Sequence, residues 1–239
     1  MKKLFSIIAL LLFVAGTGFA QNNEATVDQV GNDNEAMIDQ VGDGHKAFIY
    51  QTGNDNEAEI TQTHDDNWAE VKQYNDDNKV FIDQIYGSDN IAQIKQMGSQ
   101  EHTYFRQQGD NNIFRLRQQD GHNKVGLEDN PFTQEGHHNK FAEVTNVNGL
   151  AFNEGGYAKQ FDGAVLDPSS HQTGNENRIG LHQDGLNTGT IKQHGDENTA
   201  LLWQEGFGNE AIIDQYGDGH SASVTQIGDH NTATVIQKP

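Results

Sequence analysis

Glutamine recurs at a fixed spacing of eleven residues over most of this chain. The unbroken first series is Gln29, Gln40, Gln51, Gln62, Gln73 and Gln84, and Gln96, Gln107 and Gln118 continue it after one inserted residue. Beyond a less regular stretch, in which Gln134 and Gln160 are candidate members, the spacing returns at Gln172 and Gln183 and, after one step of ten residues, at Gln193, Gln204, Gln215, Gln226 and Gln237. A repeat of this kind has to be interpreted before any local motif, because it decides the architecture.

The residues around each glutamine favour strands over helices. Eleven residues can form three turns of a right-handed helical supercoil, but a glycine recurs in most repeats and would destabilise each helix by about 1 kcal/mol. A period of two fits better, because Ala36, Ile38 and Gln40 share one face of a strand while Glu35 and Asp39 share the other. Turn-forming Gly, Asp and Asn follow each strand. The chain is therefore predicted to be all-β.

Two strands and two turns make a closed unit of about 22 residues. This length suits one rung of a flattened β-solenoid, in which strand-turn-strand rungs stack about 4.8 Å apart. Residues eleven apart then lie on opposite sheets, and residues 22 apart lie directly above one another. The predicted fold is a β-solenoid that becomes cross-β on assembly.

The solenoid explains why glutamine, and not glutamate, occupies the repeated position. Stacked amides can hydrogen-bond along a buried column, since each donates and accepts, whereas stacked carboxylates would repel in a low dielectric. The glutamines of the two regular series are therefore predicted to form structural amide ladders. Asparagines at a second repeated position are predicted to join them, namely Asn34, Asn56, Asn67, Asn78, Asn112, Asn177, Asn198, Asn209 and Asn231.

Composition is consistent with a narrow, polar core. Hydrophobic residues make up only 33% of the 239 residues, and there are 26 glycines, 3 prolines and no cysteine. Disorder is the alternative for such a polar chain, but disorder does not predict strict periodicity. The net charge of −20, or −22 without Lys2 and Lys3, argues against binding to nucleic acid or to an anionic membrane.

Four segments are predicted along the chain. Residues 1–20 have the basic start, short apolar run and small residues of a Sec signal peptide, so export is expected, with no membrane insertion. Residues 21–119 and 172–239 carry regular repeats. Residues 120–171, which contain Pro131 and Pro168, are predicted to be degenerate repeats with longer loops.

The spacing Gln-x4-Asn-x5-Gln occurs nine times without a slip, for example at Gln29, Asn34 and Gln40. It resembles the curlin repeat of bacterial curli fibres, with Asn or His (His45, His220) where curlins often have serine. The resemblance implies a secreted amyloid subunit of the biofilm matrix, involved in adhesion and surface colonisation. It further implies end-to-end self-assembly, a second curlin subunit as partner, and export through the periplasm and an outer-membrane secretion pore. Whether the chain is the major subunit or a minor nucleator stays open.

No pattern predicts catalysis, a cofactor or a metal site. The eleven histidines fall mostly singly in turns, and the adjacent His137 and His138 lack the companions of a metal motif. Oxygen-rich turns lack the nine-residue period of calcium-binding β-rolls. The chain is therefore predicted not to be an enzyme. The alternative to a fibre subunit is a monomeric secreted β-solenoid that serves as an adhesin or as a ligand- or ice-binding module. The regular repeats near both ends of the sequence favour the fibre, because a soluble solenoid needs capped ends.

Overall fold

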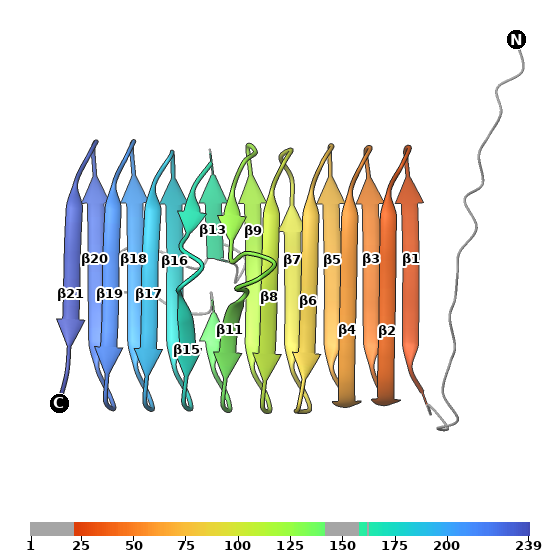
Figure 1. Cartoon of the computed structure of the whole chain (residues 1–239), viewed down its shortest axis with the longest axis horizontal. Coiled ribbons are helices and arrows are strands. Elements are labelled where there is room, and N and C mark those ends of the chain that lie inside the picture. The colour runs from red at the N-terminus through yellow and green to blue at the C-terminus, as the bar shows by residue number, and fades with distance from the viewer. Residues whose placement is uncertain (1–21, 142–157, 162) are drawn as a thin grey trace, which may run out of the picture.

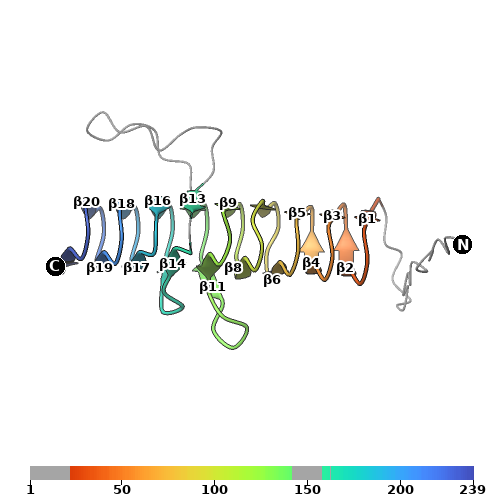
Figure 2. The same ribbon diagram turned by 90° about the horizontal axis from the view of Figure 1, so that it is seen from above.

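The chain forms an elongated, flattened β-solenoid (Figures 1 and 2). The computed structural model describes residues 22–141, 158–161 and 163–239, which contain strands and no helix. The described residues accordingly hold no helix long and apolar enough to cross a membrane. Successive strands alternate between two facing parallel sheets, so the chain completes about nine turns. The predicted all-β solenoid is confirmed.

Each sheet is built from every second strand position, and three of these positions hold two short strands each. The first sheet contains β1 (Glu24–Val30), β3 (Lys46–Thr52), β5 (Trp68–Tyr74), β7 (Ile91–Gln96), β9 (Ile113–Gln119), β12 (Lys140–Phe141), β13 (Ala158–Phe161), β16 (Arg178–Asp184), β18 (Thr199–Glu205) and β20 (Ser221–Ile227). The second contains β2 (Glu35–Asp43), β4 (Glu57–Asp65), β6 (Lys79–Ile85), β8 (His102–Gln108), β10 (Lys124–Val125), β11 (Phe132–Glu135), β14 (Val165–Leu166), β15 (His171–Thr173), β17 (Thr188–His194), β19 (Glu210–Tyr216) and β21 (Thr232–Gln237).

The pairing register follows the sequence repeat. Gln29 pairs with Gln51, and Gln40 pairs with Gln62, each 22 residues further along. The single inserted residue after Gln84 lengthens the offset to 23 between β5 and β7 without changing the face on which any side chain lies. Because the side-chain period of a strand is two, a slip within a strand would have turned its apolar residues outward. The turns absorb the insertion instead.

Glycines in the turns allow neighbouring rungs to approach closely. Gly31 and Gly53 have φ angles of 128° and 130°, a region that L side chains rarely adopt. A Cβ added to Gly31 would lie 1.8 Å from the carbonyl oxygen of Gly53 on the next rung. The recurring glycine is therefore needed both for the shape of the turn and for the stacking of one turn on the next.

The core is a narrow strip between the two sheets. In most rungs each strand turns one small residue, one branched residue and one glutamine inward, as with Ala47, Ile49 and Gln51. In the middle of the solenoid, phenylalanines replace these small and branched residues. Their rings stack, with centroids 3.7 Å apart for Phe105 and Phe114 and 4.7 Å apart for Phe114 and Phe141. The fourth member is Phe132, which is fully buried.

The irregular stretch from residue 120 to residue 171 continues the solenoid through interrupted strands. β10 and β11 share one strand position, as do β12 with β13 and β14 with β15. Short connections containing Pro131 and Pro168 leave the second sheet within a strand position, between β10 and β11 and between β14 and β15. Asn130 Nδ2 donates to the Pro168 carbonyl oxygen at 2.7 Å, which joins the two connections. The insertions therefore lie within strands and not in the rung turns.

Two parts of the sequence-based prediction lie outside the described residues. The predicted signal peptide falls within residues 1–21, and the glycine-rich part of the irregular stretch falls within residues 142–157.

Candidate assembly interface

Two ladders of glutamine side chains run along the core, one on each sheet. In each ladder the Nε2 atom of one glutamine donates to the Oε1 atom of the glutamine on the next rung toward the C-terminal end. The first ladder joins Gln29, Gln51, Gln73, Gln96, Gln118, Gln160, Gln183, Gln204 and Gln226 at 2.7–3.0 Å. The second joins Gln40, Gln62, Gln84, Gln107, Gln134, Gln172, Gln193, Gln215 and Gln237 at 2.7–3.1 Å.

The second hydrogen of each interior amide is also used. Gln62 Nε2 donates to the Lys46 carbonyl oxygen at 3.2 Å, and Gln84 Nε2 donates to the Trp68 carbonyl oxygen at 3.1 Å. Each interior glutamine thus links its own sheet to the opposite sheet as well as to its neighbours in the column. This is the reason that glutamine can be fully buried here, since a buried amide has to be hydrogen-bonded.

The asparagines make a different set of bonds, mainly to the backbone. Asn56 Nδ2 donates to the carbonyl oxygen of Asn75 at 2.8 Å, in the turn of the next rung, and Asn34 Oδ1 accepts from the Asn56 backbone N–H at 3.1 Å. Direct bonds between asparagine side chains are fewer, for example from Asn56 Nδ2 to Asn34 Oδ1 at 3.0 Å. The asparagine columns therefore hold the turns in place, while the glutamine ladders bridge the two sheets. The predicted members in these columns are Asn34, Asn56, Asn67, Asn78, Asn112, Asn177, Asn198, Asn209 and Asn231.

Several residues in these columns were not in the predicted set. The structure places the candidate members Gln134 and Gln160 in the ladders, and it adds Asn23, Asn90, Asn123, Asn139 and Asn187 to the asparagine columns. Strand insertions and slips in spacing hid Asn90, Asn123, Asn139 and Asn187, whereas Asn23 precedes the first glutamine of the series. The sequence signal that could have found the interrupted strand positions is the two halves of the repeat, separated by an insertion. The first half, Asn-Lys-Val/Phe, occurs at 123–125 and 139–141, and the second half, apolar-x-Gln, occurs at 132–134 and 158–160.

Other residue types replace asparagine at four positions, of which one is Ala164 and the other three carry polar side chains. His45 and His220 each place Nε2 near a carbonyl oxygen four residues earlier, at 3.2 and 2.8 Å, and His45 Nδ1 accepts the Asn67 N–H at 3.3 Å. The His45 ring thus reproduces both bonds of an asparagine, and the His220 ring reproduces the one to the carbonyl oxygen. Glu101 occupies the third position, where its carboxylate accepts from Gly98 N and from Asn123 Nδ2, both at 3.0 Å.

The profile of the curlin associated repeat matches five segments of this chain, at residues 20–53, 31–63, 65–98, 187–217 and 208–238. Together these segments span more than half of the sequence. The chain belongs to the curlin repeat family. The matched curlin repeats coincide with regular rungs on either side of the interrupted strands. No curated protein matches the chain.

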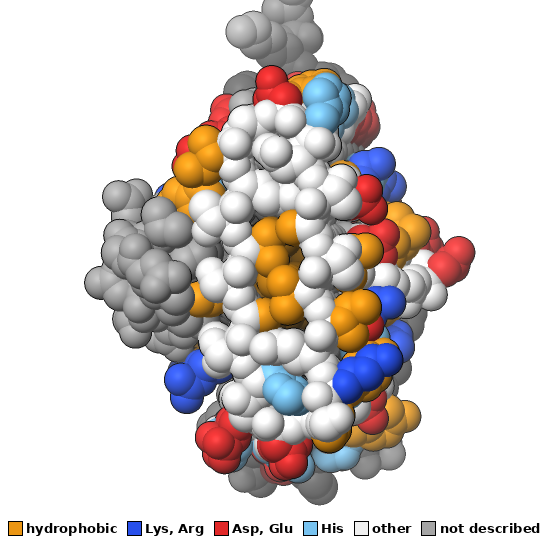
Figure 3. Space-filling model, turned by 90° about the vertical axis from the view of Figure 1, so that its left-hand side faces the viewer, with side chains coloured by type: hydrophobic (Ala, Val, Ile, Leu, Met, Phe, Trp, Pro, Cys, Tyr) orange, Lys and Arg blue, Asp and Glu red, His pale blue; other side chains and the backbone are white. Residues whose placement is uncertain are grey.

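The curlin repeats next to the two ends of the solenoid expose hydrogen-bonding groups. Gln29 and Gln40 receive no bond at Oε1 from any described residue on the N-terminal side. At the other end Gln237 Nε2 donates only to the Ser221 carbonyl oxygen and keeps one hydrogen for a further acceptor, whereas Gln226 Nε2 donates to the carbonyl oxygens of Glu210 and Asn231, both at 3.0 Å. Core residues next to the ends are only partly buried, including Val27, Ile38 and Val235. Figure 3 views the C-terminal end, where apolar side chains lie between two bands of backbone and polar atoms. The two ends are complementary, since one offers acceptors and the other donors.

Two acids, the half-buried Glu59 and the buried Glu101, predict that mild acid stabilises the solenoid. Burial raises the pKa of the Glu59 carboxyl above its usual value of 4.5, and the carboxylates of Asp83, Glu57 and Asp39 raise it further. Burial also raises the pKa of Glu101, although hydrogen bonds from Gly98 and Asn123 oppose the shift. These carboxyl groups therefore bind protons more tightly in the folded chain than in the unfolded chain. The free energy of unfolding should increase as the pH falls from 7 toward 4.5.

Guanidinium unfolding at pH 7 and pH 5 measures this effect. The wild-type midpoint should be higher at pH 5, and Glu59→Gln should reduce the difference, because glutamine does not titrate. Thr61→Ser, on the same face of β4, should leave the difference unchanged. An unfolding midpoint that falls on acidification in all three proteins would contradict the assignment.

Proposed function

We propose that this chain is a secreted, self-assembling structural subunit of extracellular, curli-like amyloid fibres, in which copies join end to end. The observation that carries the proposal is the pair of glutamine ladders that reach both ends of the solenoid with acceptors at one end and donors at the other. A second copy placed on the C-terminal end would receive the free hydrogen of Gln237 Nε2 at its Gln40, and it would receive Gln226 Nε2 at its Gln29 in exchange for the bond from Gln226 to the Asn231 carbonyl oxygen. The ladders would then continue without interruption.

The charges at the two ends support the same orientation. The N-terminal rung carries Glu24, Asp28 and Glu35 on its outer faces, whereas hydroxyl residues occupy the corresponding columns of the C-terminal rung at Ser221, Thr225 and Thr232. Joining unlike ends places carboxylates beside hydroxyls. Joining two N-terminal ends would place carboxylate on carboxylate, which is destabilising, and would oppose acceptor to acceptor in both ladders.

An interface between unlike ends does not close, and so it produces a filament and not a dimer. The unpaired edges of β20 and β21 would accept the backbone of the next copy as strand addition. We further propose that the protein is exported by the Sec route, that it passes through a dedicated outer-membrane pore, and that a second curlin subunit assists its assembly. The role is structural and not catalytic, and it contributes to biofilm matrix, adhesion and surface colonisation.

Dilution of the purified mature chain from denaturant tests the proposal. Fibres should form, with diffraction spacings of about 4.7–4.8 Å along the fibre and about 10 Å across it. Deleting the gene in its host should remove fibres from the cell surface, and restoring it should return them. A chain that refolds to a stable, dispersed monomer would instead support the alternative of a monomeric adhesin or binding module.

A further inference from the structure

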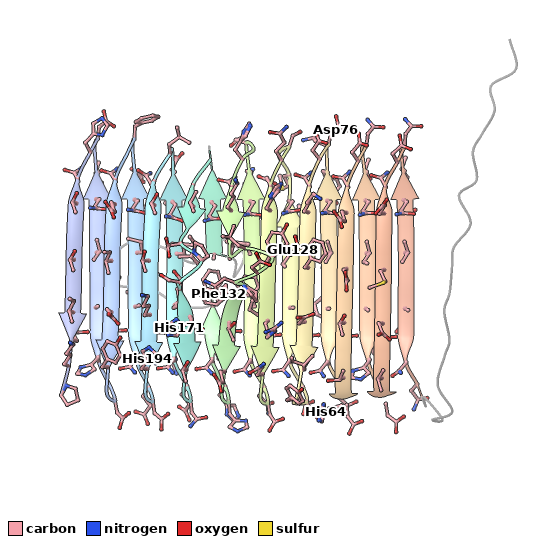
Figure 4. All side chains as sticks on the ribbon, in the orientation of Figure 1. His64, Asp76, Glu128, Phe132, His171 and His194 are labelled. Atoms are coloured by element: carbon pink, nitrogen blue, oxygen red, sulfur yellow. The ribbon has the colours of Figure 1, made fainter. Side chains whose placement is uncertain are left out.

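Two histidines meet on the outer face of the second sheet, beside the connection that contains Pro168. His171 lies on β15 and His194 on β17, where Thr173 is the strand partner of His194, so the two imidazoles are diagonal neighbours. Their Nε2 atoms lie 2.8 Å apart, and the ring planes are inclined by 71°. Figure 4 shows the two rings next to each other at the lower part of the sheet.

Each imidazole is held in place by its own neighbours. His171 Nδ1 lies 2.8 Å from the Ser169 carbonyl oxygen, which can only accept, so Nδ1 carries a hydrogen and the Nε2 of the neutral ring carries a lone pair. Ser169 is fixed in turn, because its backbone N–H and its hydroxyl both donate to Asp167 Oδ1, at 2.8 and 2.6 Å. The ring of His194 stacks on Tyr216, with centroids 4.8 Å apart and planes within 8°.

The separation of the two nitrogens matches a pair of metal ligands. Two imidazole nitrogens bound at about 2.0–2.1 Å to one ion, with a right angle between the bonds, lie about 2.9 Å apart. That is the arrangement of neighbouring ligands in a square-planar site, which Cu²⁺ and Ni²⁺ prefer. The bond from His171 Nδ1–H to a backbone carbonyl is also the usual support of a ligating histidine, because it fixes the tautomer and the direction of the ring.

We propose that His171 and His194 form a binding site for one divalent transition-metal ion with square-planar preference, Cu²⁺ above all. In the metal-free pair, His194 Nε2–H donates its hydrogen to the lone pair of His171 Nε2. When the ion binds, His194 carries this hydrogen on Nδ1 instead, and the Nε2 atoms of both rings bind the ion. Copper has the highest affinity of the divalent ions for nitrogen sites. No set of three or more His, Cys, Asp or Glu side chains is placed to hold a metal in the described part of the chain. Water therefore fills the other two positions.

The surroundings of the pair admit such an ion. A surface hollow between the two proline-containing connections is lined by His171 together with Thr133, Glu135 and Thr173, which offers space and oxygen atoms for bound water. Two charged residues lie beside the pair. Lys192 on β17 is the strand partner of His171, and Asp214 on β19 is the strand partner of Lys192. The net charge of −20 favours the approach of cations to the whole chain.

Titration of Cu²⁺ alone into the wild-type protein, followed by calorimetry and by electron paramagnetic resonance, tests the site. We expect one tightly bound Cu²⁺ per chain with two imidazole nitrogens in its spectrum. His171→Ala and His194→Ala should each weaken this binding at least tenfold. The matched control is the double variant His137→Ala with His138→Ala, which removes two adjacent histidines elsewhere and should bind as the wild type does.

Two results would overturn the proposal. One is a wild-type spectrum without two nitrogen ligands, which needs no variant and so does not depend on variant folding. The other is loss of binding in the His137 and His138 variant with retention in the His171 and His194 variants. Because Cu²⁺ binding is measured on a single chain whose β-structure is checked by circular dichroism, failure here would leave the fibre proposal standing, and failure to form fibres would leave this site standing.

Discussion

Replacing Gln107 by glutamate should abolish assembly at neutral pH, whereas the same change at the adjacent Gln108 should not. Gln107 is fully buried, accepts from Gln84 at 2.9 Å, and donates to Gln134 Oε1 and to the Ile91 carbonyl oxygen at 3.1 and 3.2 Å. A carboxylate can only accept, so both donated bonds would be lost and two oxygens would face each other. Gln108 lies on the outer face of the same strand.

The expected loss is large because two effects act together. Each buried acceptor left without a donor costs about 1–3 kcal/mol, and an uncompensated buried charge costs about 3–5 kcal/mol. Fibre yield and the guanidinium midpoint measure the outcome at pH 7 for both variants. Gln107→Glu should recover partly as the pH is lowered, and recovery should begin above the usual carboxyl range, because burial raises the pKa of the new carboxyl and its protonated form can donate one bond. Equal behaviour of the two variants would contradict the structural role of the ladder.

Proline at one position on each end should stop fibre elongation without unfolding the chain. Outward-facing residues donate their backbone N–H toward the C-terminal neighbour, as Glu35 does to the Asn56 carbonyl oxygen at 2.8 Å, whereas inward-facing residues donate toward the N-terminal neighbour, as Asn56 does to Asn34 Oδ1 at 3.1 Å. The exposed donors therefore include those of Ile38 on β2 and Thr234 on β21. Proline removes a donor from each edge.

Seeded growth with Ile38→Pro and Thr234→Pro tests this arrangement. Each single variant should dock once through its intact end and then cap the filament, and the double variant should not elongate seeds at all. The controls Ile38→Ala and Thr234→Ala shorten the same side chains but retain the N–H groups, so they should elongate more than tenfold faster than the proline variants. Elongation by the double proline variant at the wild-type rate would rule out growth by end-on stacking.

The glutamine spacing was sufficient to predict the fold. A period of eleven with alternating faces determined the rung length and the offset of 22 between paired residues, and the structure confirms both. The structure also places Gln40 above Gln62 as a hydrogen-bonded pair. These features depend on local alternation and on one repeated distance, both of which can be counted in a sequence.

The centre of the solenoid could not be predicted in the same way. Phe105 and Phe114 lie at regular inward positions of β8 and β9, but Phe132, which packs against both rings, lies on β11 in an interrupted strand position. Whether a phenylalanine in an irregular stretch faces inward depends on the register that the insertions leave, and the insertions remove the spacing from which register is read. The histidine pair could not be predicted from the sequence for a related reason. His171 and His194 are 23 residues apart and meet only because β15 stacks on β17.

The mass per length of the fibre tests the account most directly. If copies join end to end as nine-turn solenoids, one chain should occupy about 43 Å of fibre, which is nine rungs at about 4.8 Å. Scanning transmission electron microscopy of unstained fibres measures this value for a single filament. One chain per about 43 Å is the predicted result. One chain per about 4.8 Å would show that each copy adds a single flat layer, and would contradict both the solenoid subunit and its end-on assembly.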